Sequence, residues 1–166
     1  MKAIVYTKYG PPDVLQLTEV AKPVPKANEI LVKVHATTVG YGDITARNFR
    51  AISPREFNMP MPLWLPTRLA FGVRKPRNQI LGASFAGEVE TVGQDVTQFK
   101  AGDPVFGYLG AKMGANAEYL CVPQTGTVAI KPANMTYEEA AAVPYGAIMA
   151  LSLLRRVNIQ KGRKVL

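Results

Sequence analysis

The chain has 166 residues, of which 48% are apolar, and a formal net charge of +8. This length suffices for one hydrophobic core and part of a second, so the composition predicts a globular protein. The single cysteine, Cys121, excludes a disulfide framework and a cysteine-based zinc site within the chain, and it favours a reducing cytoplasm. Because the sequence has no apolar leader and no run of about 18 apolar residues, we expect neither export nor a membrane span.

The first part of the chain alternates apolar and polar residues, as half-buried strands do. Residues 2 to 9 and 13 to 20 predict a hairpin across Gly10-Pro11-Pro12, and residues 29 to 38 predict the clearest strand. Residues 39 to 47 then predict a glycine turn and a short helix, with Asp43 as its N-cap.

Residues 48 to 78 form a long connection that is rich in proline and methionine and holds the only tryptophan, Trp64. Connections of this length in compact domains are usually functional or mobile. Three interpretations remain open. The segment is a lid over a substrate cleft, or a dimer contact or peripheral membrane patch favoured by the nearby arginines, or a surface excursion whose apolar residues cover the body of the domain.

The middle of the chain, residues 79 to 108, predicts two strands. An alternating run from Phe85 to Val92 predicts a half-buried strand, and a turn at Gly102-Asp103 leads into a strand from Pro104 to Phe106. After a turn at residues 112 to 114, residues 116 to 122 and 127 to 130 predict two more strands. The sequence therefore predicts a mainly β domain with short helices.

The last 35 residues predict helices. Thr136 and Glu139 have the spacing of a capping box, and the helix that they begin is predicted to stop at Pro144. A second helix is predicted from Tyr145 to Arg156, and residues 163 to 166 predict the start of a strand. No glycine-rich phosphate loop follows, although a first Rossmann strand leads directly into one.

Two long motifs in this order resemble the medium-chain dehydrogenase/reductase superfamily, in particular its zinc-free branch of quinone and enone reductases. They are G-x-x-x-A-G-x-V-x-x-V-G from Gly82 to Gly93 and F-x-x-G-D-x-V-F-G from Phe99 to Gly107. The resemblance implies a GroES-like β-barrel over residues 1–126. It also implies that residues 127–166 are connecting helices and the first strand of a truncated NAD(P)-binding Rossmann domain.

The resemblance further implies hydride transfer from NADPH or NADH to a quinone or an α,β-unsaturated carbonyl, with the chain alone inactive. The hydroxyl of Tyr41 could polarise the carbonyl of the acceptor, or its ring could simply pack. The predicted catalytic residues are Tyr41, Asp43 and Ser84, the predicted cofactor contacts are Tyr41, Tyr145 and Met149, and the predicted substrate-cleft residues are Trp64, Phe106 and Tyr108.

Zinc is not expected, because Gly40, Ala83 and Tyr145 stand where the zinc-containing relatives place ligands, and their side chains do not bind this metal. We expect a small-molecule quinone or enone as partner and leave open a homodimer. A non-enzymatic, basic β-barrel that binds another partner is the alternative. Nucleic acid is not expected, because the chain lacks the interleaved aromatic residues and basic strand faces of a single-strand binder.

Overall fold

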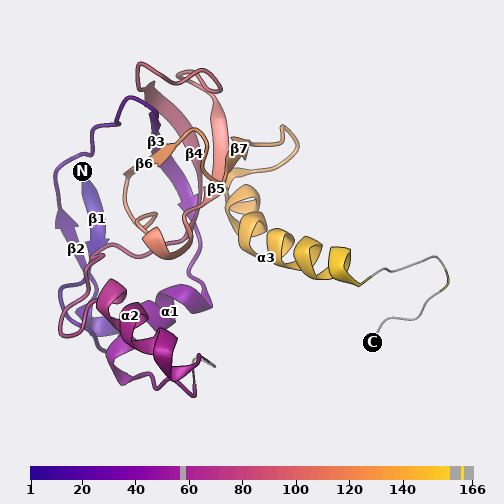
Figure 1. The fold of residues 1–166 in the computed structure, drawn as a ribbon. Coiled ribbons are helices and arrows are strands. Elements are labelled where there is room, and N and C mark those ends of the chain that lie inside the picture. Colours follow the sequence, from indigo (N-terminus) through magenta and orange to yellow (C-terminus); the bar gives the residue numbers. More distant parts are fainter. Residues whose placement is uncertain (57–58, 158–161, 163–166) are drawn as a thin grey trace.

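The computed structural model describes residues 1–56, 59–157 and 162. Its largest element is a five-stranded antiparallel sheet in the order β6-β3-β4-β5-β7 (Figure 1). The predicted strands of this sheet are confirmed, with ends that differ from the prediction by three residues or fewer. The strands are β3 (Glu29–Thr37), β4 (Ser84–Val92), β5 (Pro104–Tyr108), β6 (Tyr119–Pro123) and β7 (Val128–Ile130).

The main core lies on one face of this sheet, where alternate residues of neighbouring strands meet. Ile30 and Val32 of β3, Phe85 and Val89 of β4, and Val105 of β5 are almost completely buried there. Burying such side chains is the main force that holds the sheet together, at roughly 1.5–3 kcal/mol for each one.

The pairing of β3 with β4 depends on a glycine. A Cβ atom at Gly87 would lie 2.1 Å from the backbone oxygen of Lys33, so only glycine allows the two strands to approach this closely. The register of the pair shifts nearby, between Val34 and Ala36. The bulge bends β3, a common effect of bulges, and its end leads into the glycine turn before the first helix.

The predicted N-terminal hairpin is confirmed in its pairing but is shorter than predicted. Its strands, β1 (Lys2–Val5) and β2 (Gln16–Glu19), have four residues each, because a 3-10 helix, η1 (Pro12–Val14), occupies part of the predicted second strand. Single bridges join β1 to the rest of the domain at Ala117 and Ile80.

The first helix, α1 (Tyr41–Arg47), is present as predicted, but the prediction that Asp43 is its N-cap is wrong. Gly40 takes the N-cap position, in an extended conformation, and the helix begins three residues earlier than the prediction required. Asp43 is the third residue of the helix. From there its carboxylate reaches back to accept a hydrogen bond from the N–H of Gly40, at 2.8 Å.

The segment from 48 to 78 is not a structureless connection. It contains a 3-10 helix, η2 (Phe49–Ala51), and an 11-residue helix, α2 (Met61–Phe71). Because proline usually ends a helix, the three prolines of this segment argued against a helix in the sequence. Pro60 and Pro62 stand at the start of α2, where the backbone N–H has no partner within the helix. Pro66 removes only one internal hydrogen bond. Trp64 is 7% exposed and fixes α2 to the domain through its contact with the ring of Phe49.

The C-terminal segment forms one helix, α3 (Tyr137–Arg156), and the prediction of two helices separated at Pro144 is wrong. Pro144 lies within the helix, where it removes a single hydrogen bond. The capping box is confirmed: Thr136 Oγ1 accepts from the N–H of Glu139 at 3.2 Å, and the Glu139 carboxylate accepts from the N–H of Thr136 at 2.9 Å. The predicted strand at residues 163 to 166 lies outside the described residues.

Only the beginning of α3 packs on the sheet. Ala140 and Ala141 are buried against Ala86 of β4, and Tyr137 stacks on His35 of β3 with ring centroids 4.5 Å apart. The rest of the helix extends away from the domain (Figure 1). Its apolar side chains beyond Pro144 are therefore half-exposed: Tyr145, Ile148, Met149, Leu151, Leu153 and Leu154.

Candidate active site

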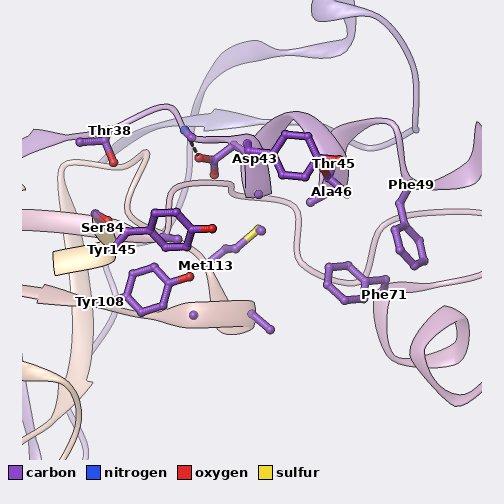
Figure 2. Close-up of a pocket in the computed structure, with 16 residues that line it drawn as sticks. Thr38, Asp43, Thr45, Ala46, Phe49, Phe71, Ser84, Tyr108, Met113 and Tyr145 are labelled. Atoms are coloured by element: carbon purple, nitrogen blue, oxygen red, sulfur yellow. Dashed lines mark hydrogen bonds between the residues drawn. The ribbon is translucent and has the colours of Figure 1, made fainter. Parts of the chain in front are cut away.

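A cavity of about 330 Å³ opens where α1, the start of β4, the end of β5 and α3 meet (Figure 2). Backbone and small side chains form much of one wall, and tyrosine, phenylalanine and methionine side chains form the rest. The lining residues that the following paragraphs use are Tyr41, Asp43, Ser84, Tyr108, Met113 and Tyr145, together with Phe49 and Phe71.

The buried carboxylate of Asp43 joins two walls of this cavity. One oxygen accepts the N–H of Gly40, and the other accepts the N–H of Gly82 at 2.7 Å, so the start of α1 is tied to the segment that enters β4. Gly82 has φ +95°, and a Cβ there would lie 2.5 Å from Oδ1 of Asn116. The local fold thus requires glycine at the point where Asp43 binds. Because both oxygens are engaged with backbone donors, the geometry gives Asp43 a positioning function.

Two tyrosines on neighbouring elements form the wall opposite α1. The rings of Tyr108, at the end of β5, and Tyr145, on α3, have centroids 5.8 Å apart and are tilted by 42°. Figure 2 shows both hydroxyls directed toward the space beside Met113. Burial raises the pKa of Tyr108, with the neighbouring Tyr145 and Asp43 as smaller causes. Its hydroxyl therefore stays protonated at neutral pH and can donate a hydrogen bond.

Ser84 and Tyr41 also line the cavity, from different depths. Ser84 is buried at the first position of β4, and its backbone oxygen accepts a hydrogen bond from Thr37 Oγ1 at 2.9 Å. Tyr41, the first residue of α1, is 72% exposed at the mouth. Tyr41, Asp43, Ser84, Tyr108 and Tyr145 are thus brought together around one space.

Three residues that were predicted for the site do not line this cavity. Trp64 lies behind Phe49, which itself lines the cavity, with ring centroids 5.2 Å apart. Phe106 packs against the buried alanines beneath α3, and Met149 is half-exposed on the part of α3 that extends away.

The apolar end of the cavity consists of residues that the sequence did not indicate. Phe49 and Phe71 stack there with centroids 4.6 Å apart, and Met113 lines the cavity between them and the tyrosine hydroxyls. Met113 adopts φ +50°, which is uncommon for a residue other than glycine and occurs frequently at functional sites. The predicted turn at residues 112 to 114 could have indicated an unusual backbone conformation at Met113. No such indication existed in the sequence for Phe49 and Phe71, because their place in the cavity depends on the packing of α2.

The arrangement suits a flat, mainly apolar molecule that carries an oxygen atom. Tyrosine hydroxyls stand at one end, the rings of Phe49 and Phe71 stand at the other, and Met113 lies beside the hydroxyls. Within the part of the chain that the structure describes, no three His, Cys, Asp or Glu side chains come together as a metal site. The only carboxylate in the lining, that of Asp43, is occupied by backbone donors.

Residues 26–132 match the model of the alcohol dehydrogenase GroES-like domain, and the chain belongs to this family. Its relatives are quinone and enone oxidoreductases of the medium-chain dehydrogenase/reductase superfamily, so the resemblance drawn from the motifs and the predicted fold class are confirmed.

Three proteins illustrate the similarity. The chain is 32% identical over 174 residues to the tomato (Solanum lycopersicum) 2-methylene-furan-3-one reductase, covering 100% of the chain and 40% of that protein. It is 37% identical to the chloroplastic quinone-oxidoreductase homolog of spinach (Spinacia oleracea), covering 90% of the chain and 40% of that protein. The structure of Escherichia coli quinone oxidoreductase complexed with NADPH superposes with a TM-score of 0.74 at 28% identity, covering 95% of this chain and 41% of that one.

The chain therefore spans about two fifths of the length of the relatives that it matches. Among the described residues, no helix combines the length and the apolar character that crossing a membrane requires.

Proposed function

We propose that this chain supplies the acceptor-binding part of an NAD(P)H-dependent reductase that transfers hydride to a quinone or an α,β-unsaturated carbonyl. The observation that carries this proposal is the two-ended cavity. Its apolar end holds the carbon skeleton of the acceptor, while the hydroxyls at the other end reach its carbonyl oxygen. The alternative, a basic module without catalytic function, gives no account of a cavity into which tyrosine hydroxyls point.

Bound NAD(P)H supplies the hydride in such a reaction. The rings of Tyr41 and Tyr145 stand at the mouth of the cavity, where their aromatic faces fit the flat nicotinamide, and Met149 follows one turn later on α3. The described residues contain no glycine-rich turn that would hold the phosphates. We therefore propose that a segment beyond these residues holds the phosphates, and that residues 127–166 connect the substrate domain, 1–126, to it.

The side chains of the chain have distinct tasks in this proposal. Tyr41 and Tyr108 donate hydrogen bonds to the carbonyl oxygen of the acceptor, from opposite walls, and so stabilise the charge that develops there as hydride arrives. Ser84 orients the acceptor between them. Asp43 keeps the walls in place through its two backbone contacts.

The proposed chemistry does not use zinc. A catalytic zinc site needs three protein ligands and an open position, and the lining offers neither an imidazole nor a thiolate. Quinones and enones are already electrophilic, so donors at the oxygen are enough to assist the transfer. Because the thiol of Cys121 has no cysteine partner in the sequence, we also propose a reducing compartment, the cytoplasm, although the spinach relative is chloroplastic.

Calorimetric titration of the chain with menadione and with methylnaphthalene, which has the same skeleton without oxygens, tests the proposed site. We expect menadione to bind about tenfold more tightly, because it alone accepts hydrogen bonds. Tyr108→Phe should remove most of this difference, and Tyr41→Phe part of it. Tyr119→Phe on β6, a tyrosine that does not line the cavity, serves as the matched control. Equal affinity of the unaltered chain for the two compounds would refute the proposal.

A further inference from the structure

The outward side of α2 is apolar along its whole length. Met61, Leu65 and Leu69 follow one another at intervals of four residues and form a stripe, with 69%, 63% and 50% of each residue exposed. A surface helix normally turns polar residues to the solvent. The remaining outward residues of α2 are also apolar: Pro62, Leu63, Pro66 and Ala70.

Basic side chains stand at both ends of this apolar stripe. Arg55 lines the same shallow depression as Met61, at the start of the helix. Beyond its end, Arg74, Lys75 and Arg77 are exposed in a turn that is fixed to the helix, since the N–H of Arg77 donates to the oxygen of Phe71 at 3.0 Å. Across the described residues, none of these four cations takes part in an ion pair.

The charge of the whole segment is one-sided. Residues 47 to 77 contain seven arginine or lysine residues and a single acidic residue, Glu56. An apolar helix face with a cation at its start and a cluster of cations at its end is the pattern of segments that lie in the interface of a membrane with anionic lipids. We propose that the stripe Met61, Leu65 and Leu69, with its flanking cations, docks on an anionic bilayer surface.

The same observations weigh against other occupants of this surface. A second copy of the chain, packed stripe to stripe, would bring the basic clusters of both copies together without acidic partners. A soluble polyanion would satisfy the cations but would leave the stripe in water. An anionic bilayer is both apolar and negatively charged and so satisfies both features, and docking on it does not depend on the proposed reductase activity.

Cosedimentation of the chain with vesicles tests the proposal. We expect binding to vesicles of phosphatidylcholine with phosphatidylserine and little binding to phosphatidylcholine alone. Leu65→Glu with Leu69→Glu should lower the bound fraction about tenfold, as should Arg74→Glu with Lys75→Glu, because insertion and charge attraction both contribute. Both pairs are exposed, so circular dichroism should show an unchanged fold.

Matched controls carry the same changes elsewhere. Leu17→Glu with Val24→Glu places two glutamates at exposed apolar positions outside the segment, and Lys8→Glu with Lys26→Glu removes the same number of cations outside it. Binding that both α2 pairs leave unchanged, or that the controls lower equally, would overturn the proposal. So would a wild-type chain that ignores both kinds of vesicle and sediments as a dimer that the leucine pair dissociates, because the surface would then be a contact between copies.

Discussion

Asp43 is the residue on which the shape of the cavity depends, because one carboxylate binds two separate backbone segments. In Asp43→Asn, only one oxygen remains, and the new NH₂ group faces an N–H that has lost its acceptor. We expect the free energy of unfolding to fall by about 3 kcal/mol, the combined cost of losing a charge-assisted hydrogen bond and leaving a buried donor unpaired. Urea denaturation measures it.

The exposed Asp13→Asn, in η1, is the control for the same chemical change, and it should alter stability by less than about 0.5 kcal/mol. If the two variants unfold at the same urea concentration, the two hydrogen bonds of Asp43 do not hold the walls.

Cys121 provides a test of burial in the sheet. Burial raises the pKa of its thiol to about 11, and the charge of Glu29 adds to the effect. Because only the thiolate reacts, and because its fraction falls as the pKa rises, we expect alkylation by iodoacetamide at about pH 8 to be roughly a hundredfold slower than that of an ordinary thiol. The rate in urea, where the chain is unfolded, is the internal reference. A native rate equal to the unfolded rate would show that the thiol is not shielded.

At the scale of elements, two aromatic side chains of α2, Trp64 and Phe71, contact the ring of Phe49. Trp64 is its only largely buried residue apart from the C-terminal turn, and it rests on Phe49. Trp64→Ala should lower the free energy of unfolding by about 3–5 kcal/mol, as large-to-small changes in buried sites do. Leu63→Ala, one residue earlier and on the exposed side, should cost less than about 0.5 kcal/mol. Thermal unfolding compares them, and similar losses in the two variants would mean that α2 is not anchored through Trp64.

The strands, in which apolar and polar residues alternate, could be predicted from the sequence. The extents of the helices that contain proline could not. The strands around Val32 and Val89 alternate in burial over part of their length, from Val32 to Thr37 in β3 and from Gly87 to Glu90 in β4, and this part carries the period of two. Proline predicts the end of a helix only when the helix cannot continue without the lost hydrogen bond, and both α2 and α3 continue past their internal prolines, Pro66 and Pro144. The capping box at Thr136 was predicted correctly because it is entirely local.

The candidate site also shows that local sequence patterns do not reveal contacts between residues far apart in the chain. Tyr41, Ser84 and Tyr108 were predicted from motifs, and the structure places them around one cavity. The hydrogen bond between Asp43 and Gly82 joins residues 39 positions apart, so no local pattern could reveal it. Trp64 was predicted from its place in the possible lid and Phe106 from its place in the second motif, but neither position tells which side of an element faces the cavity.

At the scale of the whole molecule, α3 and its exposed apolar residues indicate that the proposed reaction needs more than the described residues. We expect the chain alone to oxidise no measurable NADPH in the presence of menadione, because nothing in the described part holds the phosphates. The chain joined after α3 to the part of E. coli quinone oxidoreductase that it does not cover should gain this activity. NADPH absorbance follows both reactions.

The fusion also separates the activity from the fold. A fusion that binds NADPH and menadione yet transfers no hydride would contradict the proposed function, and a chain that turns over NADPH unaided would contradict the need for a second part. The same fusion with Tyr108→Phe should react on the order of a hundredfold more slowly, the usual effect of removing one donor at a developing oxyanion.

The double contact of Asp43 has a practical consequence for redesign. Because a carboxylate and two backbone N–H groups join two walls of the cavity, this connection does not involve the side chains of the apolar end. Met113 and Phe71 can then be exchanged to admit bulkier or more polar acceptors while the tyrosine hydroxyls keep their places. Selectivity and architecture are encoded by different residues, so a library limited to the apolar end should change which compounds bind while most of its members still fold.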